Sequence, residues 1–170
     1  MKIAFSDIAP GGICRIIKDS GWSSSSGVVF QRPPEAEISL LLMDDVTAML
    51  KGSLNAVIDS LCSRCGCAIS FEVDEIFDYT FRLEKDKAHA LEEIECSDED
   101  IETVHLDKPE VSIDEVLLEQ LILSIPEKLL CSKNCKGICP GCGVLLNTEQ
   151  CTCDDGLVDS PFAVLKHLKK

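Results

Sequence analysis

Six of the eleven cysteines in this 170-residue chain lie between positions 131 and 153, and their spacing constrains the fold more than any other feature. They follow the pattern C-x3-C-x3-C-x2-C-x8-C-x-C. The C-x2-C pair within it reads Cys-Pro-Gly-Cys-Gly, the form of a metal knuckle, because small residues let the backbone turn both thiolates toward one ion. A second C-x2-C pair, Cys62 and Cys65, lies far upstream. The chain is therefore expected to bind metal.

Six clustered thiols are too many for one tetrahedral ion, whereas the addition of Cys62 and Cys65 gives eight, the number for two sites of four thiolates each. The C-terminal four make a compact set; they are Cys139, Cys142, Cys151 and Cys153. Cys131 and Cys135 are then expected to join Cys62 and Cys65 in the other site. We expect one or two structural zinc ions, because cysteine can fill every ligand position and leave none open for water. The alternative to zinc is an iron–sulfur cluster, since such clusters are also held by four cysteines.

The remaining cysteines are expected to be spare thiols, although Cys67 is close enough in sequence to exchange into the first site; these three are Cys14, Cys67 and Cys96. A thioredoxin-like redox role for the upstream pair is disfavoured because no βαβ pattern surrounds it. A catalytic zinc would need a nearby base, and no histidine is close to a cysteine pair in sequence. The chain also lacks nucleophile-elbow, Walker and dinucleotide-binding motifs. We therefore expect a protein that is not an enzyme, with no catalytic residues and no small-molecule substrate.

The formal net charge is −14, and each zinc held by four thiolates would add a formal charge of about −2. Such a chain repels phosphate backbones unless its basic groups are segregated on one face, so a basic protein partner is favoured over nucleic acid. The longest apolar run, 38–43, is far too short to span a bilayer, and the first residues do not resemble a signal peptide. Without an export signal, clustered cysteines favour metal binding in the reducing cytoplasm over disulfides.

The pattern of elements predicts an α+β fold: an antiparallel β meander with a long packed helix, a cysteine-rich zinc-knuckle segment and a short closing helix. A hairpin of the meander is expected to carry Cys62 and Cys65 at its turn. Residues 1–35 are expected to form a strand and a flexible loop that includes the Gly- and Ser-rich stretch 9–32, and 36–130 a β-rich core, with one strand ending and the next beginning at Leu54 and an acidic linker at 84–110. A helix is predicted over 112–125, because Ser112 and Glu115 form a capping box and Pro126 stops it. The cysteine-rich segment and C-terminal helix are expected over 131–170, the helix beginning near Ser160.

Four features in order resemble the YceD family, also called DUF177, whose members are linked to accumulation of large-subunit 23S rRNA. They are Cys62-Ser-Arg-Cys65 after a strand, the helix end Leu121-Ile-Leu-Ser-Ile-Pro126, the segment Cys135 to Asn147 with Cys151-Thr-Cys153, and the closing Pro161-Phe-Ala-Val-Leu165-Lys. Some members of the family lack the C-terminal knuckle. The resemblance therefore implies that Cys62, Cys65, Cys131 and Cys135 form the common site.

The resemblance implies a factor in the synthesis, processing or stability of 23S rRNA. The charge of the chain favours action through a basic ribosomal protein or an rRNA-processing factor. The alternative is direct contact with rRNA through the knuckles and the lysines near them: Lys133, Lys136, Lys166, Lys169 and Lys170. A third possibility is an iron–sulfur or thiol-redox protein.

Overall fold

The computed structural model describes residues 1–18, 21–84 and 103–153, and the chain divides into two compact units. The sheet unit comprises Met1–Asp59 and Ser70–Pro126, and the cysteine unit comprises Ser60–Ile69 and Glu127–Lys170. Most of the expected acidic linker, including Cys96, lies outside the described residues, as does the expected C-terminal helix.

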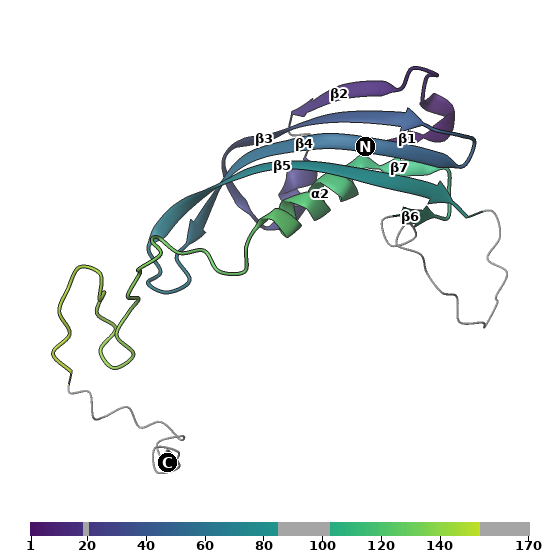
Figure 1. Ribbon diagram of the computed structural model, residues 1–170. Helices are drawn as coiled ribbons and strands as arrows, with labels where there is room; N and C mark the ends of the chain where they lie inside the picture. Colours follow the sequence, from purple (N-terminus) through teal and green to yellow (C-terminus); the bar gives the residue numbers. More distant parts are fainter. Residues whose placement is uncertain (19–20, 85–102, 154–170) are drawn as a thin grey trace, which may run out of the picture. The chain divides into compact units, whose positions relative to one another are not determined.

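The sheet unit is built on five strands in the order β2 (Ile13–Lys18), β3 (Val29–Leu42), β4 (Thr47–Leu61), β5 (Ala68–Leu83) and β6 (Thr103–Leu106) (Figure 1). β2 and β4 pair with β3 in antiparallel fashion, and β6 is parallel to β5. A small second sheet pairs β1 (Lys2–Ala4) with β7 (Glu110–Ser112). The other elements are the 3-10 helices η1 (Phe5–Asp7) and η2 (Trp22–Ser26) and the helix α2 (Ile113–Ser124). The fold is broadly α+β, as the sequence predicted, but β6 departs from the predicted antiparallel meander because it runs parallel to β5.

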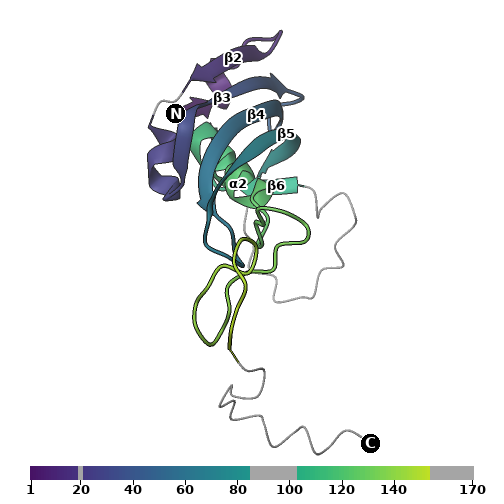
Figure 2. The same cartoon turned by 90° about the vertical axis from the view of Figure 1, so that its left-hand side faces the viewer.

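Alternation along the strands explains which face of the large sheet is buried. From Pro34 to Leu40 every second side chain of β3 is buried, including Ala36 and Ile38, because successive side chains point to opposite faces of a strand. α2 lies along this buried face (Figure 2) and contributes Leu117 and Leu121, both 0 % exposed. The core of the sheet unit therefore lies between the sheet and this helix.

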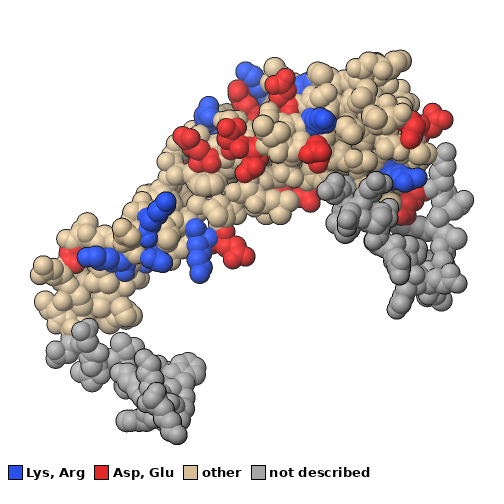
Figure 3. All heavy atoms as spheres, in the orientation of Figure 1, with Lys and Arg blue, Asp and Glu red and all other residues tan. Residues whose placement is uncertain are grey.

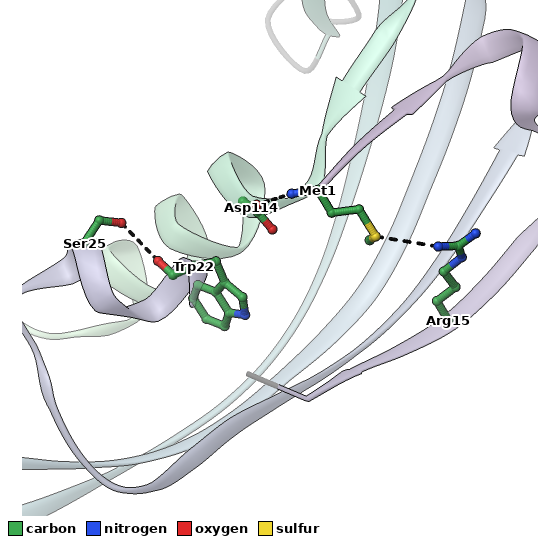
Figure 4. A network of polar contacts seen from close by, with 5 residues as sticks. All are labelled: Met1, Arg15, Trp22, Ser25 and Asp114. Atoms are coloured by element: carbon green, nitrogen blue, oxygen red, sulfur yellow. Dashed lines mark hydrogen bonds and ion pairs between the residues drawn. The ribbon is translucent and has the colours of Figure 1, made fainter. Parts of the chain in front are cut away.

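The predicted helix is confirmed over Ile113–Ser124, with Ser112 at its N-cap and its end just before Pro126. The capping box is wrong in one respect, because the side chain of Ser112 makes no capping hydrogen bond. The backbone N–H of Ile113 instead donates to the carbonyl of Met1 (3.0 Å), and the Met1 ammonium pairs with Asp114 (Figure 4). The first backbone N–H of α2 thus finds its hydrogen-bond acceptor in the N-terminal segment of the chain and not in the side chain of Ser112. None of the helices in the described part of the chain is long and apolar enough to cross a membrane.

The structure corrects two expectations about the strands. The Gly- and Ser-rich stretch 9–32 was expected to be a loop, yet it contains β2, η2 and the start of β3, and Trp22 in η2 is only 5 % exposed. β4 was expected to break near Leu54 but runs continuously to Leu61. The alternating core positions continue through Gly52, where a Cβ atom would lie 2.5 Å from Cζ of Phe77 on β5. This glycine leaves room for an aromatic ring of the neighbouring strand.

Candidate metal centres

The first cysteine pair lies in the turn between β4 and β5, as predicted, because β4 ends at Leu61 and β5 begins at Ala68. The turn closes through hydrogen bonds from the N–H of Cys62 to the carbonyl of Cys67 (2.8 Å) and from the N–H of Gly66 to the carbonyl of Cys62 (2.9 Å). Gly66 has a φ of +71°, a conformation that favours glycine. The backbone therefore curls around the sulfurs of the turn.

Four sulfurs lie within 4.8 Å of one another at this turn, those of Cys62, Cys65, Cys67 and Cys131. Cys135 adjoins them, with its sulfur 3.7 Å from that of Cys62. We call these five residues the first cluster. The structure thus brings together all four residues predicted for the first site and adds Cys67, which was expected to be either a spare thiol or a replacement ligand in this site. Its place two residues after Cys65 was the only signal in the sequence.

The separations of the sulfurs fit a tetrahedral ion. Zn–S bonds of about 2.3 Å imply sulfur–sulfur edges of about 3.8 Å. The sulfurs of Cys65 and Cys131 are 3.6 Å apart, close to this value, as is the 3.7 Å separation of Cys62 and Cys135. The sulfur of Cys67 lies only 3.3 Å from that of Cys65. The first cluster can therefore hold a metal ion, and it offers five thiols for four ligand positions.

Hydrogen bonds from backbone amides lower the pKa of one cysteine in the first cluster. Burial raises the pKa of Cys62, but hydrogen bonds from the backbone amides of Cys131, Arg64 and Cys65 outweigh it and lower the pKa to about 5. The N–H of Cys131 lies 3.3 Å from the sulfur of Cys62. For Cys65, a hydrogen bond from the backbone of Cys67 lowers the pKa, whereas the neighbouring sulfurs and burial raise it, and the net direction is upward. The surroundings thus favour the thiolate form of Cys62 and the protonated form of Cys65 in the absence of a cation.

The second cluster matches the predicted C-terminal set: its four sulfurs lie within 4.8 Å of one another, and they belong to Cys139, Cys142, Cys151 and Cys153. The sulfurs of Cys142 and Cys151 are 3.6 Å apart, and those of Cys139 and Cys151 are 3.3 Å apart. These four soft thiols in one small volume can hold a metal ion without help from any other residue.

Backbone donors again favour a thiolate in the second cluster. A hydrogen bond from the backbone of Cys142, with help from Cys151 and from the N–H of Gly141, lowers the pKa of Cys139 to about 6. The sulfurs of Cys142 and Cys151 raise the pKa of Cys153 to about 12. Each cluster thus combines thiols of lowered pKa, such as Cys62 and Cys139, with thiols of raised pKa, such as Cys65 and Cys153.

The loop that carries the second cluster folds back beside the first one. Ile138 and Leu145 form a β-bridge, and the N–H of Leu146 donates to the carbonyl of Gly137 (3.0 Å). The pairing brings Asn147 to the first cluster, where its Nδ2 donates to the sulfur of Cys135 (3.2 Å). Asn147 could not be predicted as a contact of the first cluster, because a residue beside the knuckle of one site carries no signal for a role at another.

The remaining candidates do not join these clusters. Cys14 is exposed on β2, where its sulfur lies 3.6 Å from the hydroxyl of Ser39. His105, on β6 of the sheet unit, has its Nδ1 3.3 Å from a carboxylate oxygen of Glu84. Both clusters consist of cysteine alone among the residues that the structure describes.

The fold and the clusters define the class of protein: an α+β protein whose cysteine unit carries two thiol clusters that can hold metal ions. The family described as large ribosomal RNA subunit accumulation protein YceD matches residues 50–169, which include β5, α2 and both clusters. The chain belongs to this family. Searches for similar curated proteins and for similar solved structures found no match.

Proposed function

We propose that the protein promotes accumulation of 23S rRNA in the cytoplasm as a zinc-binding factor without catalytic activity. The observation that carries this proposal is the family match over residues 50–169, because the family is described by accumulation of large-subunit rRNA. Clusters made of cysteine alone support a structural metal, since a catalytic zinc keeps one position open for water. Every cysteine in the described part of the chain is a free thiol, which suits a reducing compartment.

The charge of the sheet unit supports a basic protein as the partner, either a ribosomal protein or an rRNA-processing factor. Among its described residues sixteen are acidic and seven are basic. Figure 3 shows acidic side chains spread over this unit. Glu37, Glu72 and Asp78 are exposed on β3 and β5, on the opposite side of the sheet from the core. Such a surface attracts cationic proteins and speeds their association.

Direct contact with rRNA is the second candidate, and the distribution of charge favours it. In the described part of the cysteine unit, the basic residues are Arg64, Lys128, Lys133 and Lys136, and only two residues are acidic. Figure 3 shows this gathering of basic side chains. The basic groups are thus segregated from the acidic sheet unit, the condition under which an acidic protein can approach a phosphate backbone. Two tetrathiolate zinc sites would offset this charge by about −2 each.

Charge reversal in cells distinguishes the two candidates. One variant carries Glu37→Lys, Glu72→Lys and Asp78→Lys, and the other carries Lys133→Glu and Lys136→Glu. Each replaces the wild-type chain as the only copy, and the ratio of 23S to 16S rRNA is measured. Loss of 23S rRNA with the first variant alone supports the protein partner. Loss with the second alone supports direct contact with RNA, and binding to purified rRNA that falls steeply with salt would then accompany it.

The proposed function itself is tested by removal of the protein. Cells that lack the chain are expected to contain less 23S rRNA relative to 16S rRNA, and the wild-type chain is expected to restore the ratio. An unchanged ratio in cells without the protein would refute the role in rRNA accumulation, whatever the metal content of the purified chain.

A further inference from the structure

The orientation of the Asn147 side chain is fixed by hydrogen bonds to both of its ends. The backbone N–H of Lys136 donates to Oδ1 (2.7 Å), so the amide nitrogen must point the other way. That nitrogen donates to the sulfur of Cys135 at 3.2 Å, and it lies 3.9 Å from the sulfur of Cys131. Hydrogen bonds from outside the ligand set hold metal-binding sulfurs in place and adjust their affinity for the ion.

Asn147 is nevertheless part of the loop of the second cluster, between its ligands Cys142 and Cys151. Backbone hydrogen bonds hold this loop in shape: the N–H of Cys139 donates to the carbonyl of Val144 (2.9 Å), and that of Glu149 to the carbonyl of Leu145 (2.9 Å). Closure of the second cluster around an ion would restrict the same loop at both ends. The side chain that contacts the first cluster is therefore placed by the second.

From this arrangement we propose that Asn147 is a positioning residue that couples the two metal centres, so that metal in the second cluster raises the affinity of the first. An ion in the second cluster holds the loop closed, and the closed loop keeps the amide of Asn147 on the sulfur of Cys135. Without that ion the loop is freer, so the binding of an ion to the first cluster must also supply the free energy that orders Asn147. By linkage, metal in the first cluster raises the affinity of the second by the same factor.

The test measures the occupancy of each cluster separately in the full-length reduced protein at a series of buffered free zinc concentrations. Zinc protects thiols from alkylation, so peptide mass spectrometry after a pulse of N-ethylmaleimide gives the zinc concentration that half-protects Cys131 and, independently, Cys153. Asn147→Ala is expected to raise the value for Cys131 by about 10- to 100-fold, the usual effect of losing a hydrogen-bond partner next to a ligand. Cys151→Ser, which disables the second cluster, is expected to weaken the protection of Cys131 similarly.

The double variant decides whether Asn147 carries the coupling. Once Asn147 is alanine, Cys151→Ser is expected to have little further effect on Cys131, because the connection is already lost. If Cys151→Ser weakens the first cluster equally with and without Asn147, the coupling passes through the backbone and the proposal is wrong. The proposal also fails if neither change alters the half-protection of Cys131.

Two further variants separate the hydrogen bond to sulfur from a general loss of structure. Asn147→Asp keeps the acceptor for the N–H of Lys136 but removes the donor to Cys135, so it is expected to behave like Asn147→Ala. Full affinity in Asn147→Asp would show that only the bond to Lys136 matters and would overturn the proposal. Asn134→Ala, at an exposed asparagine next to Cys135, is the matched control and is expected to bind zinc like the wild-type chain.

Discussion

Gly52→Ala tests whether the space beside β4 is as tight as the structure indicates. The added Cβ atom would lie 2.5 Å from Cζ and 2.8 Å from Cε2 of the Phe77 ring, and 3.0 Å from the carbonyl oxygen of Glu37. Carbon atoms pack best at about 3.5–4.0 Å, so the ring would have to move by about 1 Å. Phe77 is only 6 % exposed, and Tyr79 lies beside it with ring centroids 6.1 Å apart. The movement must therefore be shared with other core side chains.

We expect the substitution to lower the free energy of unfolding by about 1–3 kcal/mol, the usual cost of overpacking a core. The assay is urea unfolding followed by tryptophan fluorescence. The chain has a single Trp, Trp22, which lies in the sheet unit, so the signal reports on that unit and not on the metal centres. Zinc should be held constant, because bound metal changes apparent stability.

Gly11→Ala is the matched control, since a Cβ atom at Gly11 would meet nothing within 4 Å. Its urea midpoint is expected to stay the same or to rise slightly, because alanine restricts the unfolded chain. Phe77→Leu, with a smaller side chain, should recover part of the stability that Gly52→Ala loses when the two are combined. Equal midpoints for Gly52→Ala and Gly11→Ala would refute the packing argument.

Three other outcomes follow from the structure. Cys142→Ser, which leaves only three thiols in the second cluster, is expected to reduce zinc in the purified protein from two ions per chain to one, whereas Cys14→Ser should leave two; native mass spectrometry checks this, and iron with sulfide instead of zinc would contradict it. In metal-free protein the Cys139 thiol should titrate near pH 6, which its 13Cβ chemical shift would report. Because folding lowers the pKa of this thiol, its contribution to stability is present at high pH and is lost as pH falls through about 6. A titration midpoint above pH 8 would be inconsistent with the hydrogen bonds to its sulfur. Leu117→Ala, at a side chain 0 % exposed, should cost about 2–5 kcal/mol in urea unfolding, and Leu123→Ala, at one 68 % exposed, no more than about 0.5 kcal/mol; similar losses for the two would show that α2 does not bury the face described.

The elements predicted correctly from sequence are those whose signals are local. The helix ending at Pro126 and the hairpin around Cys62 could be predicted because proline, alternating apolar residues and a C-x2-C turn act within a few positions. β2 and η2 were missed because the Gly and Ser residues around them make the whole stretch resemble a loop. η2 has four serines after Trp22, whereas β2 reads Ile-Cys-Arg-Ile-Ile-Lys and suits a strand. β2 pairs with β3 over six residues, from Ile13 to Lys18, so its own residues were a better guide than the composition of the stretch.

The clusters show the same division. The four cysteines of the second cluster lie close together in sequence, and the structure brings their sulfurs together. For the first cluster, spacing could indicate which segments meet but not which of five thiols would lie nearest one another. Cys67 joins the cluster because the turn between β4 and β5 curls back on itself, with the N–H of Cys62 bonded to the carbonyl of Cys67. This is a property of the backbone path and not of residue type.

The two clusters also differ in the length of chain between their cysteines, and this difference affects the unfolded protein. An ion in the second cluster links residues no farther apart than Cys139 and Cys153, whereas an ion in the first would link the turn at Cys62 to Cys131. The entropic cost of closing a loop grows by about 0.6 kcal/mol for each doubling of its length, so the longer closure costs about 1–2 kcal/mol more. During synthesis the second cluster can close as soon as the segment from Cys139 to Cys153 has been made. The thiols of the turn at Cys62 are made much earlier, and they lack their partner Cys131 until α2 has been made.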